Sequence, residues 1–300
     1  MLEKLEFMIA LSREQHFGRA AESCGVAQPT LSLGIRSLEE MLNVPLVKRS
    51  SRFQGFTPEG ERVLVWARRL VGDARAMRQD ILTFNGGSEA RLRIASIPSA
   101  MSLVAKITLP FQERHPGVRF TVLARSSGVL LNLLHQREID VGVTYLSHEP
   151  IGDVSAIPLY REQYLLLTTP NGPLGYADRV TWRQAAEVPL GLLDRDMQNR
   201  RIVDNVLRRV GAEPSPMIET DSVAALIAYV RLGKCASIVP SSALEAVNLA
   251  DTLRAIPITD PDVSHTIGFV VSERFPLTPT VAALMTEARA LSPRDLLPAA

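Results

Sequence analysis

The chain has 300 residues, of which 46% are hydrophobic and 22% charged, and its net charge is +1. This length and composition indicate a globular protein with two or three domains. No apolar run approaches the roughly 20 residues that a membrane-spanning helix needs. A net charge near zero says nothing about nucleic acid, so any such function must rest on where the basic residues lie.

The amino-terminal segment and the cysteines indicate a cellular compartment. Glu3, Glu6 and Glu14 lie at helical spacing in residues 1–15, which therefore do not resemble a cleavable signal peptide. The two cysteines, Cys24 and Cys235, lack the neighbours of a metal site. We expect a cytoplasmic protein with reduced, structurally buried thiols and with neither a metal nor a cofactor.

The pattern of residues 17–42 predicts a helix, a tight turn through Gly25 and a second helix, which together form a helix-turn-helix motif. The second helix begins near Pro29 and keeps Leu31, Ile35 and Leu38 at helical spacing. Its other face carries hydroxyls, an amide and an arginine, which are groups that meet base edges in a major groove. On this helix we expect DNA contacts from Gln28, Pro29, Thr30, Ser32, Leu33 and Arg36.

A wing hairpin is predicted next, because two short extended segments, 46–49 and 54–57, flank a polar turn. Arg49 and Arg52 would face phosphates. The alternative for residues 1–60 is an ordinary small helical domain whose polar face is merely solvated.

This segment resembles the winged helix-turn-helix of LysR-type transcriptional regulators over some forty-five residues. The resemblance implies sequence-specific binding to a promoter. The chain departs from the family at Leu33 and Gly34, where a polar or basic residue is common, and this puts one usual contact in doubt. Gly34 costs the helix about 1 kcal/mol against alanine, although it would allow close approach to the duplex. The residues that carry the resemblance are Phe17, Ala20, Ala21, Gln28, Pro29, Ser32, Ile35, Leu38, Glu39, Pro45, Leu46, Arg49, Thr57, Pro58, Glu59 and Gly60.

A long helix capped by Thr57 should follow, with a heptad seam that implies a partner helix from a second copy. The alternative is that this helix packs on its own carboxy-terminal domain. The resemblance implies a homodimer through the helix, and usually a homotetramer built from two dimers. Residues 86–88, Gly-Gly-Ser, should end this helix and form a hinge between the domains. The seam residues are Val63, Ala67, Leu70, Ala74, Met77 and Ile81.

From Arg91 onward strands alternate with helices in two successive sets, which predicts an α/β architecture with a parallel sheet. The second set includes a strand at 164–168 and a helix opened by a capping box of Thr181 and Gln184. The landmarks of this region are the segments 92–94, 115–118, 139–142, 230–233 and 238–240. On these residues the region resembles the LysR effector domain, whose two lobes have the fold of type 2 periplasmic binding proteins. The expected domains are a winged helix-turn-helix (1–58), a linker helix with its hinge (59–87) and an effector domain (88–300). Lobe I would comprise about 88–161 and 267–300, and lobe II about 162–266.

A ligand of such a domain lies in the crevice at the strand ends, near helix starts that favour small anions. The resemblance places Ser99, Ser127 and residues 197–200 in this cleft. We therefore expect a small anionic effector, with a formate-like carboxylate as one candidate, and Arg200 or its neighbour Arg201 as the counter-charge. The alternatives are that the serines only cap helices and that Arg200 is solvated. The expected effector contacts are Ser99, Ser127, Gln198, Asn199, Arg200 and Thr220.

Motifs of catalysis are missing from the sequence. It contains no G-x-S-x-G elbow, no phosphate-binding P-loop and no G-x-G-x-x-G fingerprint, and its five histidines lack zinc-ligand spacing. We therefore predict no catalytic residues and a transcriptional regulator rather than an enzyme. The rival interpretations are a solute-binding or sensor protein of the same two-lobed fold, and a metabolic enzyme with an added DNA-binding domain.

Overall fold

A computed structural model of the chain describes residues 1–48, 53–84, 90–147, 150–245, 252–273 and 277–291. Contacts divide it into two compact units, one formed by residues 1–87 with 133–139 and the other by residues 88–132 with 140–300. None of the described helices has the length and apolar character to cross a membrane.

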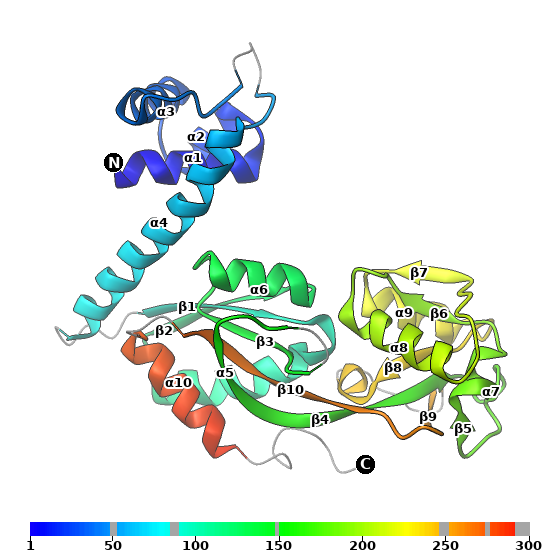
Figure 1. Cartoon of the computed structure of the whole chain (residues 1–300). Helices are drawn as coiled ribbons and strands as arrows, with labels where there is room; N and C mark the ends of the chain where they lie inside the picture. Colours follow the sequence, from blue (N-terminus) through cyan, green and yellow to red (C-terminus); the bar gives the residue numbers. More distant parts are fainter. Residues whose placement is uncertain (49–52, 85–89, 148–149, 246–251, 274–276, 292–300) are drawn as a thin grey trace. The chain divides into compact units, whose positions relative to one another are not determined.

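The first unit is helical, as predicted (Figure 1). Its helices pack around a small core in which Met8, Leu11, Leu31 and Leu38 are fully buried. The α3 helix starts at the expected place and ends where Asn43 adopts a left-handed conformation. The helices are α1 (Leu2–Glu14), α2 (Phe17–Ser23), α3 (Gln28–Leu42) and α4 (Pro58–Phe84).

The base of the predicted wing is present as an antiparallel bridge between Val47 and Phe56. The Lys48 backbone N–H donates to the Gly55 carbonyl at 3.1 Å, which closes the hairpin one step further. Arg49 and Arg52 lie outside the described residues, so their assignment to phosphates stays a prediction.

The α4 helix begins as predicted, because Thr57 Oγ1 accepts a hydrogen bond from the Gly60 N–H at 2.9 Å. The predicted heptad seam of α4 has a buried part and an exposed part. Ala67 is fully buried and Val63 packs partly against the core of the first unit, so this part of the seam is filled from within the chain. Leu70, Met77 and Ile81 are exposed.

The second unit is an α/β structure built on one sheet with the strand order β2-β1-β3-β10-β4-β9-β5, in which β8 also pairs with β4. A separate pair, β6 and β7, is parallel. The strands are β1 (Ala90–Ser96), β2 (Val118–Ala124), β3 (Val141–Tyr145), β4 (Val154–Thr168), β5 (Val180–Thr181), β6 (Gly191–Leu193), β7 (Ile218–Thr220), β8 (Ser237–Pro240), β9 (Arg254–Thr259) and β10 (Ser264–Ser272).

Three helices of this unit begin where a polar side chain caps them, and Thr278 caps α10. Thr181 and Gln184 form the predicted capping box of α7, and Ser222 caps α9. The helical segments are η1 (Pro98–Ala100), α5 (Met101–Arg114), α6 (Ser127–His135), α7 (Trp182–Ala186), α8 (Gln198–Arg209), α9 (Val223–Arg231), η2 (Ser241–Leu244) and α10 (Pro279–Ala290).

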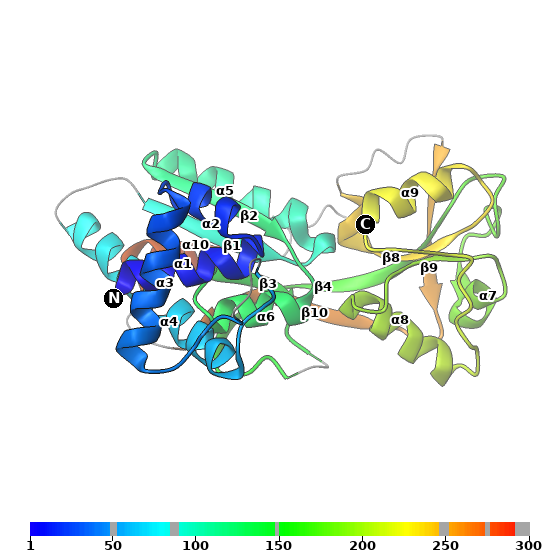
Figure 2. The same cartoon turned by 90° about the horizontal axis from the view of Figure 1, so that it is seen from above.

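Two long strands connect the lobes. Strands β1, β2 and β3 are parallel, but β10 runs antiparallel to both β3 and β4. The sheet is therefore mixed, where we had predicted a parallel one. The strand predicted at 164–168 is the end of β4, which passes with β10 from one lobe to the other (Figures 1 and 2).

Candidate DNA-binding face and effector cleft

One face of α3 is polar and open to solvent. The helix turns Leu31, Ile35 and Leu38 into the core, and this orientation leaves the residues between them on the outside. Gln28 Nε2 donates to Ser32 Oγ at 3.2 Å, so two of the expected contacts lie side by side. Ser32 is half-buried, and the other exposed members of the predicted set are Gln28, Pro29, Thr30, Leu33 and Arg36.

The two departures from the family pattern have different roles. Leu33 is 63% exposed in the middle of the polar face, where its side chain is placed for an apolar contact such as a thymine methyl group. Gly34, in contrast, faces inward. A Cβ at this position would lie 2.6 Å from Phe7 Cδ2 of α1. The expectation that Gly34 serves approach to DNA is therefore wrong, because the absent side chain makes room for a ring inside the domain.

A cavity of about 900 Å³ lies between the lobes of the second unit. On one side are the loops that follow β1 and β2, and on the other are the loops that follow β6 and β7. This is the strand-end position at which α/β proteins bind ligands. We call this cavity the outer cleft, and its lining residues are Pro98, Ala124, Arg125, Ser126, Asp194, Asp196, Met197, Glu219, Thr220, Asp221, Ser222 and Val223.

A much smaller pocket of about 10 Å³ continues inward and shares Pro98, Ser126 and Met197 with the outer cleft. We call it the inner pocket. It brings together Ser99, Ser127, Gln198 and Asn199, all of which the sequence had predicted as effector contacts. Thr220 lines the outer cleft.

Hydrogen bonds hold the side chains of Ser127 and Gln198 at the inner pocket. The Ser127 and Thr144 hydroxyls lie 2.9 Å apart, and Gln198 Nε2 donates to the Ser147 carbonyl at 3.4 Å. Asn199 is 6% exposed and its side chain interacts with the Tyr145 hydroxyl, but its Nδ2 makes no hydrogen bond of good geometry among the described residues. The inner pocket therefore offers a buried N–H donor to an incoming oxygen atom.

Arg200 does not take the place that we predicted for it. Its side chain is fully buried, with Nε 2.7 Å from Asp204 Oδ1 and Nη1 2.8 Å from Glu219 Oε1. Burial opposes the charged form, but the bonds to the two carboxylates outweigh it and raise the pKa of Arg200 above its ordinary value. Because these carboxylates already compensate its charge, Arg200 is a structural cation within lobe II, and it lines neither the outer cleft nor the inner pocket.

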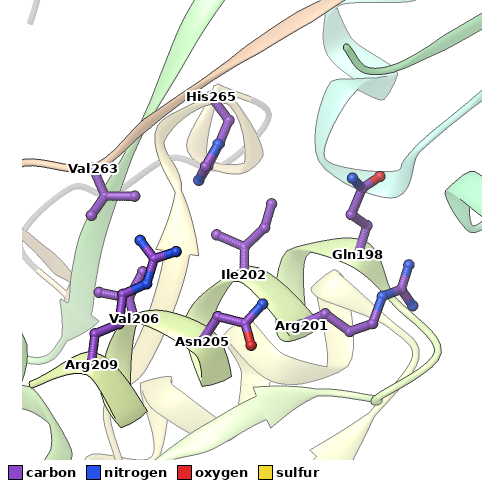
Figure 3. A pocket seen from close by; sticks show the side chains of 8 residues that line it. All are labelled: Gln198, Arg201, Ile202, Asn205, Val206, Arg209, Val263 and His265. Carbon is purple, nitrogen blue, oxygen red and sulfur yellow. The ribbon is translucent and has the colours of Figure 1, made fainter. Parts of the chain in front are cut away.

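Arg201 faces a different pocket, of about 110 Å³, on the side of α8 that meets β10 (Figure 3). Its Nη1 donates to the Asp196 carbonyl at 2.8 Å. In Figure 3 His265 points from β10 towards Ile202 of α8. Neither Arg200 nor Arg201 therefore lines the outer cleft, where the effector was expected.

A buried carboxyl lies where β4 passes between the lobes. Glu162 is fully buried and accepts hydrogen bonds from Tyr145 at 2.9 Å, from Tyr160 at 3.0 Å and from the Ser242 hydroxyl. Burial raises its pKa to about 7, although these hydrogen bonds oppose the shift. Across the strands Glu162 pairs with His265 of β10. Because Tyr145 also lines the inner pocket, Glu162 connects the cleft to the shared strands.

Two family models match the chain. Residues 2–61 match the bacterial regulatory helix-turn-helix protein of the lysR family, and residues 85–292 match the LysR substrate binding domain. The chain belongs to the LysR family of transcriptional regulators.

Curated relatives of this LysR-family protein include several named as peroxide-responsive. The chain is 29% identical to a probable hydrogen peroxide-inducible genes activator of Mycobacterium avium, over 89% of this chain and 86% of the relative. It is 26% identical to the DNA-binding transcriptional dual regulator OxyR of Escherichia coli K12, over 92% and 90% of the two chains.

Solved structures show the same fold over nearly the whole length. Full-length OxyR from Pseudomonas aeruginosa, in a substituted form, is similar with a TM-score of 0.72 and 25% identity, covering 97% of this chain and 98% of that one. CbnR in complex with its target DNA has a TM-score of 0.70 at 19% identity, covering 97% and 99%. The second likeness concerns the fold alone.

The sequence reasoning missed the acidic side chains of the outer cleft. Asp194 and Asp196 follow β6, and Glu219 and Asp221 lie at the end of β7 and just beyond it. A signal was available, because each short apolar segment runs into two acidic residues spaced two apart. Since β6 and β7 are parallel neighbours, both pairs reach the same edge.

Proposed function

We propose that this LysR-family regulator binds a promoter dyad through α3 and the wing, and that a small molecule between the lobes controls this binding. The observation that carries the proposal is the pairing of two features in one chain. One unit presents an exposed polar helix face, and the other contains a 900 Å³ cavity at its strand ends. The solute-binding interpretation leaves the first feature unexplained, and the enzyme interpretation requires a catalytic site for which the sequence shows no motif.

The DNA contacts would come mainly from the exposed face of α3. A helix of this type enters the major groove with its amino-terminal part, where Gln28 and Thr30 lie, and Arg36 would reach a guanine or a phosphate further along. A second copy is needed for a dyad, since one helix reads only one half-site. The exposed Leu70, Met77 and Ile81 of α4 support dimerisation through this helix, and tetramers would follow from a further interface.

The effector would act by its differential affinity for two arrangements of the regulator. We place it in the outer cleft, which Thr220 lines, with one end in the inner pocket. The inner pocket is where Ser99, Ser127, Gln198 and Asn199 meet. Arg200 would hold α8 against β7 and act on the effector only by shaping this wall.

The relatives named as peroxide-inducible activators raise thiol oxidation as an alternative signal. Burial raises the pKa of both Cys24 and Cys235, which lowers their thiolate fraction and their reactivity. Neither cysteine lines the outer cleft or the inner pocket. We therefore favour a reversibly bound small molecule as the signal for this chain.

DNA binding is tested by titrating the full-length protein against a labelled duplex from its own promoter. Arg36→Ala should weaken binding by about 1 kcal/mol or more. If Arg36 contacts a phosphate, the salt dependence should fall, and if it reads a base, specificity should relax at one position. Arg209→Ala removes the same charge from an exposed site in lobe II and serves as the control. Unchanged affinity in both Arg36→Ala and Ser32→Ala would remove α3 as the recognition helix.

Effector control is tested separately with Ser99→Ala combined with Ser127→Ala in a promoter reporter. The double variant should lose its response to inducing growth conditions while its effector-free DNA affinity stays at the wild-type value. A full response in that variant would place the effector elsewhere. Product formation by the purified protein from a metabolite mixture would instead favour the enzyme interpretation.

A further inference from the structure

The charge of the outer cleft is opposite to the charge that an anionic effector needs. Four carboxylates line it, those of Asp194, Asp196, Glu219 and Asp221, against one lining cation, Arg125. The negative charge of Glu219 is compensated by an ion pair with Arg200, which does not line the cleft. The other three carboxylates make no ion pair within the described part of the chain. A second anion in this cavity would meet repulsion, whereas a cation would be attracted.

These carboxylates do not form a metal site. Within the described residues, no three His, Cys, Asp or Glu side chains are grouped closely enough to hold a metal ion. The carboxylates instead line a wide wall of lobe II, with Glu219 in β7 and the three aspartates on the loops after β6 and β7. A dispersed negative wall suits the extended charge of an organic ammonium or guanidinium group.

The inner pocket, in contrast to the outer cleft, suits a negatively charged oxygen of a ligand. Asn199 is 6% exposed and interacts with Tyr145, but its Nδ2 makes no hydrogen bond of good geometry among the described residues. A bound molecule that supplies an acceptor oxygen would therefore remove the free-energy cost of this poorly paired donor. A volume of about 10 Å³ admits a group the size of one oxygen atom. Asn199 also lies in the first turn of α8, a twelve-residue helix whose start favours negative charge.

We propose that the effector is a small zwitterion of the amino-acid type, held with a carboxylate oxygen at Asn199 in the inner pocket and with an ammonium or guanidinium group against Asp194, Asp196 and Asp221. The inference rests on the proposed function and names the ligand class for it. It replaces the purely anionic effector expected from the sequence, since Arg200 is occupied by Asp204 and Glu219. The helix start keeps its role as the site of the ligand's negative end.

The two ends make the cleft selective by charge. A dicarboxylate would place its second negative group against the acidic wall, and a simple amine would leave the Asn199 donor unpaired. An amino acid satisfies both ends at once. Its length sets how far the positive group reaches into the outer cleft, so longer basic amino acids would meet more of the wall than short ones.

The test uses full-length protein dialysed against a metabolite extract of a bacterial culture, with retained compounds released by denaturation and identified by mass spectrometry. The wild-type protein should enrich a compound that carries both a carboxylate and an ammonium or guanidinium group. Combined Asp194→Asn, Asp196→Asn and Asp221→Asn should reduce its retention at least about fivefold. Asn199→Asp, which replaces a donor by a negative charge, should reduce it as well.

The control is Asp153→Asn, which neutralises an exposed carboxylate that does not line the cleft, and it should retain the compound as the wild type does. Thermal melting of every variant shows whether it is folded. Retention of a compound with acidic groups only, or equal retention by the triple variant, would overturn the inference and leave effector control intact. Enrichment of no compound at all would contradict effector control itself, and the inference would fall with it.

Discussion

Arg200 Nη1 lies 2.8 Å from Glu219 Oε1 and thereby ties the start of α8 to β7. The same guanidinium binds Asp204 on α8 through Nε, and Asp204 is far more buried than Glu219, with side-chain exposures of 9% and 41%. A buried cation that loses a partner is costly, whereas a half-exposed partner is replaced by water.

The first prediction follows from this difference. Asp204→Asn should lower the free energy of unfolding of lobe II by about 3 kcal/mol, and Glu219→Gln by less than about 1 kcal/mol. Urea unfolding followed by Trp182 fluorescence, in a Trp66→Phe background, reports on lobe II because Trp182 is buried there. Equal losses in the two variants would show that Arg200 does not depend on its buried partner.

The second prediction concerns Glu162. Its pKa is raised to about 7, so the folded protein holds this proton more tightly than the unfolded chain does. The resulting stability is fully present below about pH 4.5 and is lost as the pH rises through about 7. The loss should amount to ~3 kcal/mol. Glu162→Gln should flatten this part of the profile, as measured by urea unfolding between pH 4 and 8. A variant whose profile follows that of the wild type would assign the pH dependence to another group.

The third prediction concerns dimerisation through α4. Leu70→Glu with Met77→Glu places charge on the exposed seam and should shift the protein to monomers in sedimentation velocity, with weaker binding to a two-half-site duplex. Val65→Glu makes the same change on the other side of the helix and should leave the dimer intact. If the double variant stays dimeric, the association must use another surface.

The fourth prediction separates this chain from peroxide-responsive regulation. Because burial raises the pKa of Cys24 and Cys235, hydrogen peroxide should leave promoter affinity unchanged. Cys24→Ser and Cys235→Ala should behave as the wild type with and without peroxide in the same titration. A peroxide-dependent affinity that disappears in either variant would make that thiol the sensor.

Periodic features of the sequence predicted much of the fold. The spacing of Leu31, Ile35 and Leu38 fixed the buried side of α3, and Thr57 marked the start of α4. Strand β4 was largely missed because Pro158 interrupts it. Pro158 lacks an N–H, but it lies opposite Gly268 where the register of β10 shifts, so the strand continues past it.

The candidate cleft was predicted in position and only partly in chemistry. Ser99, Ser127, Gln198 and Asn199 meet at one pocket because they follow strand ends, and strand ends can be recognised from sequence. The charge balance depended on contacts across the fold. Asp204 lies four positions from Arg200 on the same helix, a spacing that the sequence shows, whereas Glu219 is nineteen positions away and only the fold brings it to Arg200.

Promoter recognition under effector control is tested by fluorescence anisotropy of the purified, full-length protein at physiological salt. A duplex from its own promoter is compared with a random duplex of equal length, with and without dialysed metabolite extract. We expect the affinity for the promoter duplex to exceed that for the random duplex by about a thousandfold or more, and we expect the extract to change this ratio. Equal affinity for the two duplexes in both conditions would contradict both expectations.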